Sequence, residues 1–208
     1  GEYEFALAFA LGVALAALVA PLAVPRGSPL VQAAAMFLTA AMVVYARLVV
    51  PPIKQAIQPL SPALDSVWLP LHVGTAALAY GALAMAGAAG FVWLVRAYRW
   101  DTLDRVAVEK PLDRAVAAGY PLLTLSMIFG MIWAQVAWGR YWGWDLKEVW
   151  TLSTWLVYTL YWHLRTRPRW QGRRLAWLAV VGLGAVLFTF LGVGWLARKV
   201  GLESLHLF

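Results

Sequence analysis

The sequence predicts an all-α membrane protein with about six transmembrane helices and one external tryptophan-rich segment. Hydrophobic residues make up 62% of the chain and charged residues only 13%, whereas soluble domains average about half and about a quarter. Apolar runs of about 20 residues, the length that crosses a bilayer core, recur along the chain as far as residue 196. A cleaved secretory signal has a single short apolar core and cannot explain this recurrence. We therefore expect one transmembrane domain over 1–208.

Six apolar segments have the length of a transmembrane helix. They cover roughly residues 4–24, 30–50, 68–95, 119–137, 148–165 and 175–196. The first is rich in Ala, Leu and Val and ends around Pro21 and Pro25. The third contains AYGALAMAGAAG (79–90), whose small residues permit close contact between helices. The polar connections are short, which excludes a separate soluble domain between the segments.

The distribution of Lys and Arg predicts the orientation in the membrane, because cytoplasmic loops are enriched in both. Basic residues gather in the connections 96–114 and 165–174, which we therefore place inside, together with Arg26. The termini and the connections 51–67 and 138–147 then lie outside, and the protein is expected in the cell (inner or plasma) membrane. Most of the net charge of +7 comes from this bias. Basic loops beside a membrane suit anionic lipid headgroups, and the absence of a basic face with interleaved aromatic residues argues against nucleic acid as a partner.

Cysteine is absent from the chain. Its absence excludes a thioredoxin-like redox motif, a disulfide framework, an iron–sulfur site and covalent haem attachment on this chain. Any cofactor must therefore be held by other groups.

The stretch WGRYWGWDLKEVW, residues 138–150, contains four tryptophans and one tyrosine. Trp and Tyr gather at membrane interfaces, and an interfacial belt remains an alternative, but it explains one or two such residues rather than this density. Trp138 and Trp142 are four residues apart, so a short helix would place them on one side. Gly139 and Gly143 lack side chains and would let a flat ligand approach the backbone. We therefore expect a flat aromatic ligand here.

A porphyrin needs broad apolar surface for its ring and cationic or donor groups for its propionates. Arg140 and Lys147 are candidates to bind the propionates. Asp145 is a candidate to orient an indole N–H or to pair with Arg140. The stretch thus carries the residue types that a haem requires.

The chain has three histidines, and the predicted topology separates them. His72 and His206 lie on the outer face with the tryptophan stretch, whereas His163 lies near the inner end of its helix. Zinc usually takes three or four Cys or His ligands, and this face offers two histidines. Two imidazoles on opposite sides of a macrocycle complete a six-coordinate haem iron. A histidine at headgroup level bonded to water or to a carbonyl remains the alternative for each.

The string WGRYWGWDLKEVWTLSTWLVYTLYWHLR, residues 138–165, resembles the WWD motif of the haem-handling proteins of cytochrome c maturation. It is most similar to the CcsA (ResC) branch, the membrane component of the System II cytochrome c synthase. The YWHLR element and the KEVW continuation favour this branch over the related CcmC proteins of System I. Residues 61–83 and 188–208 resemble the family segments that carry the two external histidines, so the resemblance covers about 61–208. The first two helices match only as generic spans.

The resemblance implies a role for each candidate residue. His72 and His206 would be the axial ligands of an external haem b, bound without covalent attachment and only transiently. Asp145 would close the motif, and His163 would belong to a second haem site completed by a CcsB-type membrane protein. The aromatic platform for the haem would consist of Trp138, Tyr141, Trp142, Trp144 and Trp150.

The predicted function is to hold haem at the outer face and to present it to apocytochrome c for covalent attachment. The sequence offers no nucleophile or acid–base pair, so we assign no catalytic residue, and the chain is at most a subunit of the synthase. Two alternatives remain open. One is a b-type electron-transfer subunit, which usually places pairs of histidines on facing helices. The other is a small-molecule permease, which often shows broken helices and repeat symmetry.

Overall fold

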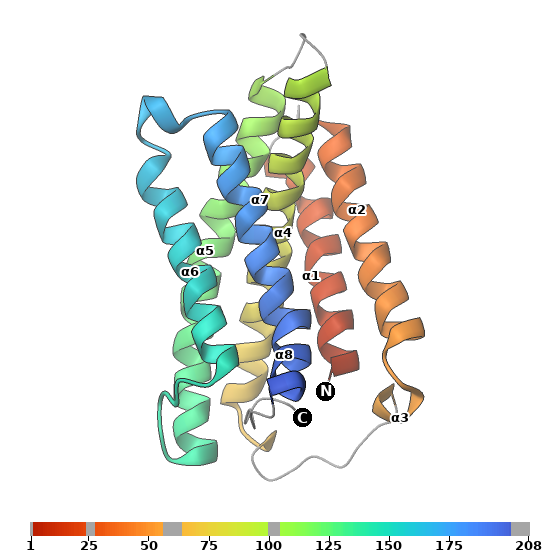
Figure 1. The fold of residues 1–208 in the computed structure, drawn as a ribbon, viewed down its shortest axis with the longest axis vertical. Helices are drawn as coiled ribbons and strands as arrows, with labels where there is room; N and C mark the ends of the chain where they lie inside the picture. The colour runs from red at the N-terminus through yellow and green to blue at the C-terminus, as the bar shows by residue number, and fades with distance from the viewer. Residues whose placement is uncertain (1, 24–27, 56–63, 100–104, 201–208) are drawn as a thin grey trace.

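The computed structural model describes residues 2–23, 28–55, 64–99 and 105–200, and the regular elements within these ranges are all helical (Figure 1). The elements are α1 (Glu2–Ala23), α2 (Pro29–Val44), η1 (Tyr45–Val49), α3 (Pro52–Gln55), α4 (Trp68–Arg99), α5 (Arg105–Trp138), α6 (Leu146–Leu164), η3 (Pro168–Trp170), α7 (Arg173–Leu187), η4 (Phe188–Gly192) and α8 (Val193–Val200). The predicted all-α class is therefore confirmed for the described chain.

Helix α4 forms the centre of the bundle. It contacts α1 and α2 on one side and α5 and α7 on the other (Figure 1). Within its most apolar stretch 72% of the residues are buried, against 22% to 33% in the other apolar helices. A Cβ on Gly81 would collide with the backbone of Gly12 in α1, and one on Gly90 would lie 2.7 Å from the carbonyl oxygen of Ala176 in α7. The close contact predicted from the small residues of this helix is confirmed.

Five helical segments are long and apolar enough to cross a membrane, which makes the chain a multi-pass membrane protein. They are Glu2–Ala23, Pro29–Val49, Trp68–Ala97, Ala107–Trp138 and Arg173–Leu196. The sixth expected span corresponds to α6, whose 19 residues give a length of about 28 Å. Helix α6 is not among these five, and it carries many Trp, Tyr and Thr residues, although it packs along α7 through the depth of the bundle (Figure 1).

The structure corrects the expected connection at 96–114. Most of this segment is helical, because α4 continues to Arg99 and α5 begins at Arg105, well before the expected start at residue 119. The apolar pattern marks the part of a helix that lies in lipid, and charged residues can extend the same helix beyond that layer. Lys110 and Arg114 therefore lie on α5, where both are exposed.

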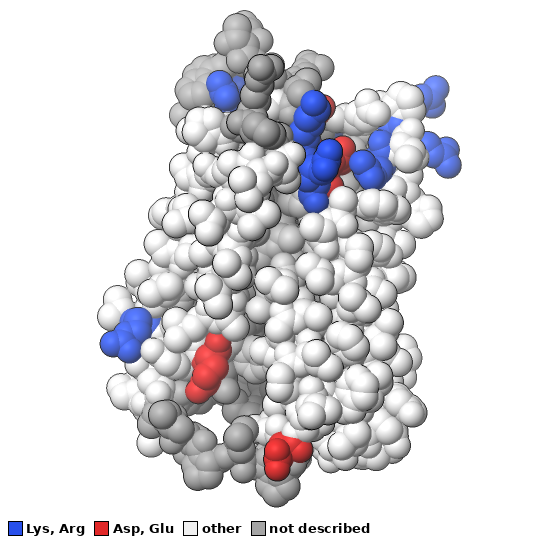
Figure 2. Space-filling view, turned by 180° about the vertical axis from the view of Figure 1, so that it is seen from behind, with Lys and Arg blue, Asp and Glu red and all other residues white. Residues whose placement is uncertain are grey.

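The two ends of the bundle differ in composition, and few charged side chains lie between them on the face that Figure 2 shows. We call one end the basic end, because it carries Arg96, Lys110, Arg114, Arg165, Arg167, Arg169, Arg173 and Arg174. The opposite end, where α5 ends and α6 begins, is the tryptophan end (Figure 1). Between them large apolar side chains such as Leu18, Phe37 and Phe91 are exposed, as expected of a surface that faces lipid.

Candidate functional site

The tryptophan stretch begins where α5 ends. Gly139 has a φ of 73° and donates its N–H to the carbonyl oxygen of Gln135 at 3.0 Å, which is how a glycine commonly terminates a helix. Residues 139–145 are not helical. The expected short helix through Trp138 and Trp142 is therefore wrong, because the left-handed backbone at Gly139 turns the chain out of the helix.

Asp145 caps the first turn of α6. Its Oδ1 accepts the backbone N–H of Glu148 at 2.8 Å, and the Glu148 carboxylate accepts the N–H groups of Asp145 (3.2 Å) and Gly143 (2.8 Å). This reciprocal arrangement is a capping box. The structural role of Asp145 and Glu148 was missed from the sequence, although Asp-x-x-Glu before an apolar run signals it.

Two aromatic residues between the helices lie partly at the surface. Tyr141 is 56% exposed and Trp144 is 70% exposed. Trp144 has a φ of 58° and is the one non-glycine residue of the described chain in the left-handed region, where a bulky side chain is unusual. Trp142 packs edge-on against Trp144 with ring centroids 5.8 Å apart. The Trp142 indole Nε1 is buried and has no hydrogen-bond partner among the described residues.

The two cationic side chains of the tryptophan stretch, Arg140 and Lys147, have different surroundings. Gly143 makes room for the guanidinium of Arg140, since a Cβ there would lie 2.8 Å from its Cζ. Arg140 itself is exposed at the tryptophan end. Lys147 lies in the first turn of α6 with its Nζ 4.9 Å from the ring centroid of Phe5 in α1, a cation–π contact. The two predicted propionate ligands thus differ, since the Arg140 side chain is exposed and the Lys147 ammonium contacts the ring of Phe5.

His72 lies near the start of α4, against one face of α5. Its Nδ1 is 2.8 Å from the carbonyl oxygen of Ser126 and 3.2 Å from the hydroxyl of the same residue. Gly130, one turn further along α5, gives the ring its space, since a Cβ there would lie 2.8 Å from Nδ1. A carbonyl oxygen only accepts, so Nδ1 carries the proton and the lone pair of the neutral ring lies on Nε2.

A third residue of α5 connects His72 to the tryptophan stretch. The ring of Trp133 stacks on His72 with centroids 6.2 Å apart, and Trp138 packs edge-on against Trp133 with centroids 4.7 Å apart. Ser126, Gly130 and Trp133 are spaced by four and three residues and share one helix face. The sequence reasoning missed all three, and this spacing on the helix that precedes the motif is the signal that points to them.

Of the remaining predicted residues, Trp150 has contacts with η4 instead of with this group. Trp150 packs against Phe188 of η4, with ring centroids 4.2 Å apart, and its carbonyl accepts the hydroxyls of Thr154 (2.8 Å) and Thr189 (3.2 Å). His206 lies outside the described residues. The structure therefore brings His72 to the tryptophan stretch and leaves the second predicted axial ligand undescribed.

His163 lies at the basic end, near the end of α6 (Figure 1). It is exposed, and its Nδ1 is 2.9 Å from the carbonyl oxygen of Thr159, one turn earlier. The guanidinium of Arg165 lies 4.7 Å from the ring centroid of Trp162 and pairs with Asp113 at 3.5 Å. The length of the bundle thus separates His163 from His72.

Comparison with known proteins gives the family. The family described as "Cytochrome C assembly protein" matches residues 2–200. The chain belongs to the cytochrome c assembly protein family. Similar relatives include the cytochrome c biogenesis protein CcsA of Synechococcus elongatus, 34% identical over 229 aligned positions that cover 86% of this chain and 70% of the relative. The CcsA protein of Parasynechococcus marenigrum is 35% identical over 85% of this chain and 68% of its own length.

Membership of the cytochrome c assembly protein family also corrects the expected extent of the resemblance. The family match begins at residue 2 and includes α1 and α2, which looked like generic spans in the sequence. In the structure α1 is also closely fitted to the central helix, because Gly12 of α1 packs directly on Gly81 of α4. Generic apolar composition therefore concealed a helix whose contact with the central helix depends on single residues.

Proposed function

We propose that this chain is the haem-binding membrane subunit of a cytochrome c synthase and that it presents haem to apocytochrome c for covalent attachment. The single observation that carries the proposal is the placement of His72, held by Ser126 and stacked on Trp133 beside Trp138. Membership of the cytochrome c assembly protein family supports a role in cytochrome c biogenesis. It favours this reading over an electron-transfer subunit or a permease.

The donor set at the tryptophan end fits a haem. Histidines that bind metals usually donate their second ring N–H to a carbonyl or carboxylate, as His72 does toward Ser126. The buried Nε1 of Trp142 is a donor with no partner in the described chain, so it is suited to a polar group of a bound ligand. His72 would be one axial ligand, His206 the other, and Trp138, Tyr141, Trp142 and Trp144 would contact the ring. The chain has no cysteine, so its own haem would be non-covalent.

The contribution of the protein is positioning. A bound haem supplies the vinyl groups that form the thioether bonds of cytochrome c. The capping box around Asp145 and Glu148 and the helix end at Gly139 fix both ends of the segment that would carry the haem. Holding two reactants in the correct geometry converts a bimolecular encounter into an intramolecular one, which lowers the barrier without a catalytic acid or base.

The charge distribution supports an orientation in which the haem faces outward. Basic residues gather at the end opposite the tryptophan stretch (Figure 2). Because cytoplasmic loops are enriched in Lys and Arg, this distribution supports an orientation with the basic end inside and the tryptophan end on the outer face of the plasma membrane. The proposed site would therefore meet an apocytochrome on the outer side. At the inner end His163 would join a second haem site with a CcsB-type partner.

Absorption spectroscopy of the purified chain tests the proposal. Protein from haem-replete cells should show a Soret band, and acidified acetone should extract the haem. His72→Ala should lose most of the band, and added imidazole should restore part of it by replacing the missing ligand. His163→Ala serves as the matched control and should keep the band, because it lies at the other end of the bundle. A colourless wild-type chain, or an unchanged spectrum in His72→Ala, would overturn the assignment.

A further inference from the structure

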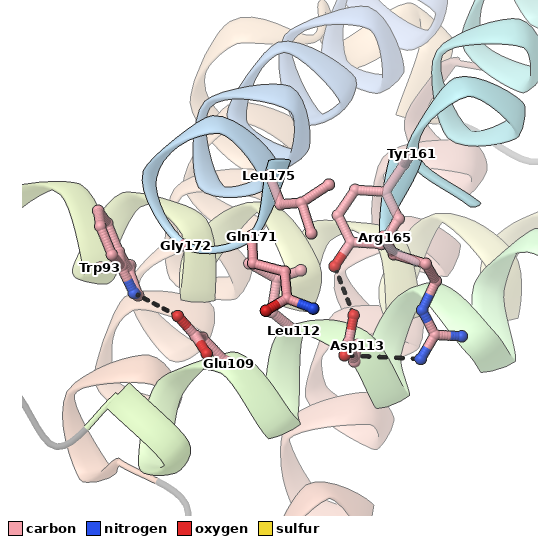
Figure 3. Close-up of a pocket in the computed structure, with 9 residues that line it drawn as sticks. All are labelled: Trp93, Glu109, Leu112, Asp113, Tyr161, Arg165, Gln171, Gly172 and Leu175. Carbon is pink, nitrogen blue, oxygen red and sulfur yellow. Dashed lines mark hydrogen bonds and ion pairs between the residues drawn. The ribbon is translucent and has the colours of Figure 1, made fainter. Parts of the chain in front are cut away.

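A polar cavity of about 170 Å³ lies at the basic end, remote from the tryptophan stretch (Figure 3). It is formed between α4, α5, α6 and the start of α7. The polar side chains that line it come from Trp93, Glu109, Asp113, Tyr161, Arg165 and Gln171. The proposed haem chemistry leaves this cavity without a role.

Two carboxylates of α5 face the cavity, and buried aromatic residues hold both of them. Glu109 accepts the indole N–H of Trp93 at 3.2 Å, and Asp113 accepts the hydroxyl of Tyr161 at 2.7 Å. Trp93 is 6% exposed and Tyr161 is 1% exposed, so these donors have little freedom to move. Glu109 and Asp113 are four residues apart and share one helix face. Each carboxylate has about four acceptor positions, so acceptor capacity remains after these bonds.

Cationic groups surround the acidic interior. Arg165 pairs with Asp113 at 3.5 Å and lies over Trp162, which holds its guanidinium at the edge of the cavity. Arg169 and Arg174 are exposed in the adjoining connection and helix start. Figure 2 shows acidic side chains between Lys and Arg side chains at this end. A ligand that fits both regions carries a positive group at its tip and a negative group behind it.

The position of the cavity relative to the membrane narrows the ligand class. In α4 the apolar run that contains Trp93 ends at Val95, directly before Arg96. In α6 the apolar run that contains Tyr161 ends at Leu164, directly before Arg165, and in α7 the apolar run begins at Leu175, directly after Arg174. These limits place the cavity at the level of lipid headgroups, where the hydrocarbon layer ends.

We propose that this cavity binds the headgroup of phosphatidylethanolamine. The primary ammonium of the lipid donates hydrogen bonds to Glu109 and Asp113, and its phosphate lies against the arginines at the edge, with Arg165 nearest. An ammonium has three N–H donors, whereas the trimethylammonium of phosphatidylcholine has none. An anionic headgroup would bring negative charge toward the two carboxylates. The cavity therefore discriminates between lipids by hydrogen bonding as well as by charge.

Native mass spectrometry of the full chain, exchanged into lipids with identical acyl chains, tests the assignment. We expect phosphatidylethanolamine to be retained about tenfold more than phosphatidylcholine, because hydrogen bonds to charged groups are among the stronger ones. The N-monomethyl and N,N-dimethyl lipids should give intermediate values. Glu109→Gln should abolish the preference while keeping an acceptor for Trp93. Asp65→Asn, at an exposed acidic residue of the tryptophan end, is the matched control and should retain it.

Several results would overturn the proposal. One such result is equal retention of phosphatidylethanolamine and phosphatidylcholine. Another is an unchanged preference for phosphatidylethanolamine in both Glu109→Gln and Asp113→Asn. Either would mean that the cavity does not bind the ammonium group. Equal binding of soluble phosphoethanolamine in phosphatidylcholine nanodiscs would reassign the site to a free ligand. A cavity that receives a cationic side chain of another protein would show no preference among lipids. The measurement is independent of haem, so failure of the haem site does not affect it.

Discussion

The imidazole of His72 lies nearly parallel to the indole of Trp133, with an interplanar angle of 11° and ring centroids 6.2 Å apart. The two residues come from different helices, α4 and α5, whose packing also brings Ser126 to the same imidazole. Trp133 is 3% exposed, so the stack is part of the helix interface rather than a surface contact. The orientation of His72 is consequently set by α5, and substitutions on α5 can alter the proposed haem site without removing a ligand.

Gly130→Ala should weaken haem binding although residue 130 is not a predicted ligand. The added Cβ would lie 2.8 Å from Nδ1 and 2.9 Å from Cε1 of His72, so the ring must rotate away from Ser126. Moving a side chain off its preferred rotamer costs about 1 kcal/mol, which corresponds to a loss of about fivefold in affinity. Haem per polypeptide in the purified variant measures the effect. Gly184→Ala is the control, because a Cβ there meets nothing within 4 Å.

Trp142→Phe should reduce haem retention more than Trp177→Phe. The substitution keeps an aromatic ring but removes the buried Nε1–H that has no partner within the described chain. Loss of one hydrogen bond to a ligand costs about 1 kcal/mol, again about fivefold in affinity. Trp177 lies on α7 and is 52% exposed, so it reports the general effect of losing an indole. Equal haem retention in both variants would indicate that the stretch is only an interfacial belt.

Asp145→Ala should destabilise the start of α6, and Asp145→Asn should not. Asparagine caps a helix about as well as aspartate, whereas alanine at this position costs about 1 kcal/mol. If Asp145 supports haem only by fixing the segment through Glu148, haem content should fall in the alanine variant and recover in the asparagine variant. Haem content and thermal unfolding should be measured on the same samples. Loss of haem in Asp145→Asn at unchanged stability would instead indicate that the negative charge acts directly.

Much of this fold could be predicted because bilayer thickness and residue polarity determine it. Apolar segments located every long helix, and the small residues of α4 identified the most closely packed one. The helix ends could not be predicted in the same way. The start of α5, with charged residues such as Glu109 and Lys110 beside Pro111, looks like a loop in the sequence, yet α5 has 34 residues. Hydropathy measures contact with lipid, and a helix can continue beyond the lipid.

The candidate site was predictable in its residue types and less so in its geometry. The tryptophan stretch and His72 were identified from the sequence, and the structure places them at one end of the bundle. The local conformation of the tryptophan stretch was not identified from the sequence. A positive φ at Gly139 ends α5 there, and the capping box at Asp145 begins α6, so the residues between them do not form the expected helix. Ser126 and Gly130 were missed because their importance depends on which face of α5 meets α4. The face of α5 that contacts α4 is determined by tertiary packing, which the sequence pattern does not show.

Gly81→Ala should destabilise the bundle without touching the proposed site. Its Cβ would collide with the backbone of Gly12, so α1 and α4 would have to separate. Overpacking of this kind costs about 1 to 3 kcal/mol. Thermal unfolding in detergent should show a lower midpoint than for Gly74→Ala, a control on the same helix whose Cβ meets nothing within 4 Å. Similar midpoints for the two variants would show that the helices tolerate a wider separation.

His163 should bind haem only in the presence of a second chain. Its Nδ1 faces the Thr159 carbonyl at 2.9 Å, which leaves the lone pair on Nε2 and gives His163 the same tautomer as His72. The two residues lie at opposite ends of the bundle, separated by roughly the length of α6, about 28 Å. One iron cannot bridge that distance, and His206 is expected at the tryptophan end. We therefore expect the second axial ligand of the proposed site at the basic end to come from a companion, for which a CcsB-type protein is our candidate.

Haem per polypeptide should consequently rise when the chain is purified with its companion, and His163→Ala should remove only the added haem. Thr166→Ala, an exposed neighbour at the same end, should leave both amounts unchanged. His72→Ala should show the opposite pattern, with loss at the tryptophan end and retention at the basic end. A second bis-histidine spectrum from the isolated chain would contradict both the separation of the histidines and the need for a partner, because no described residue near His163 supplies another imidazole.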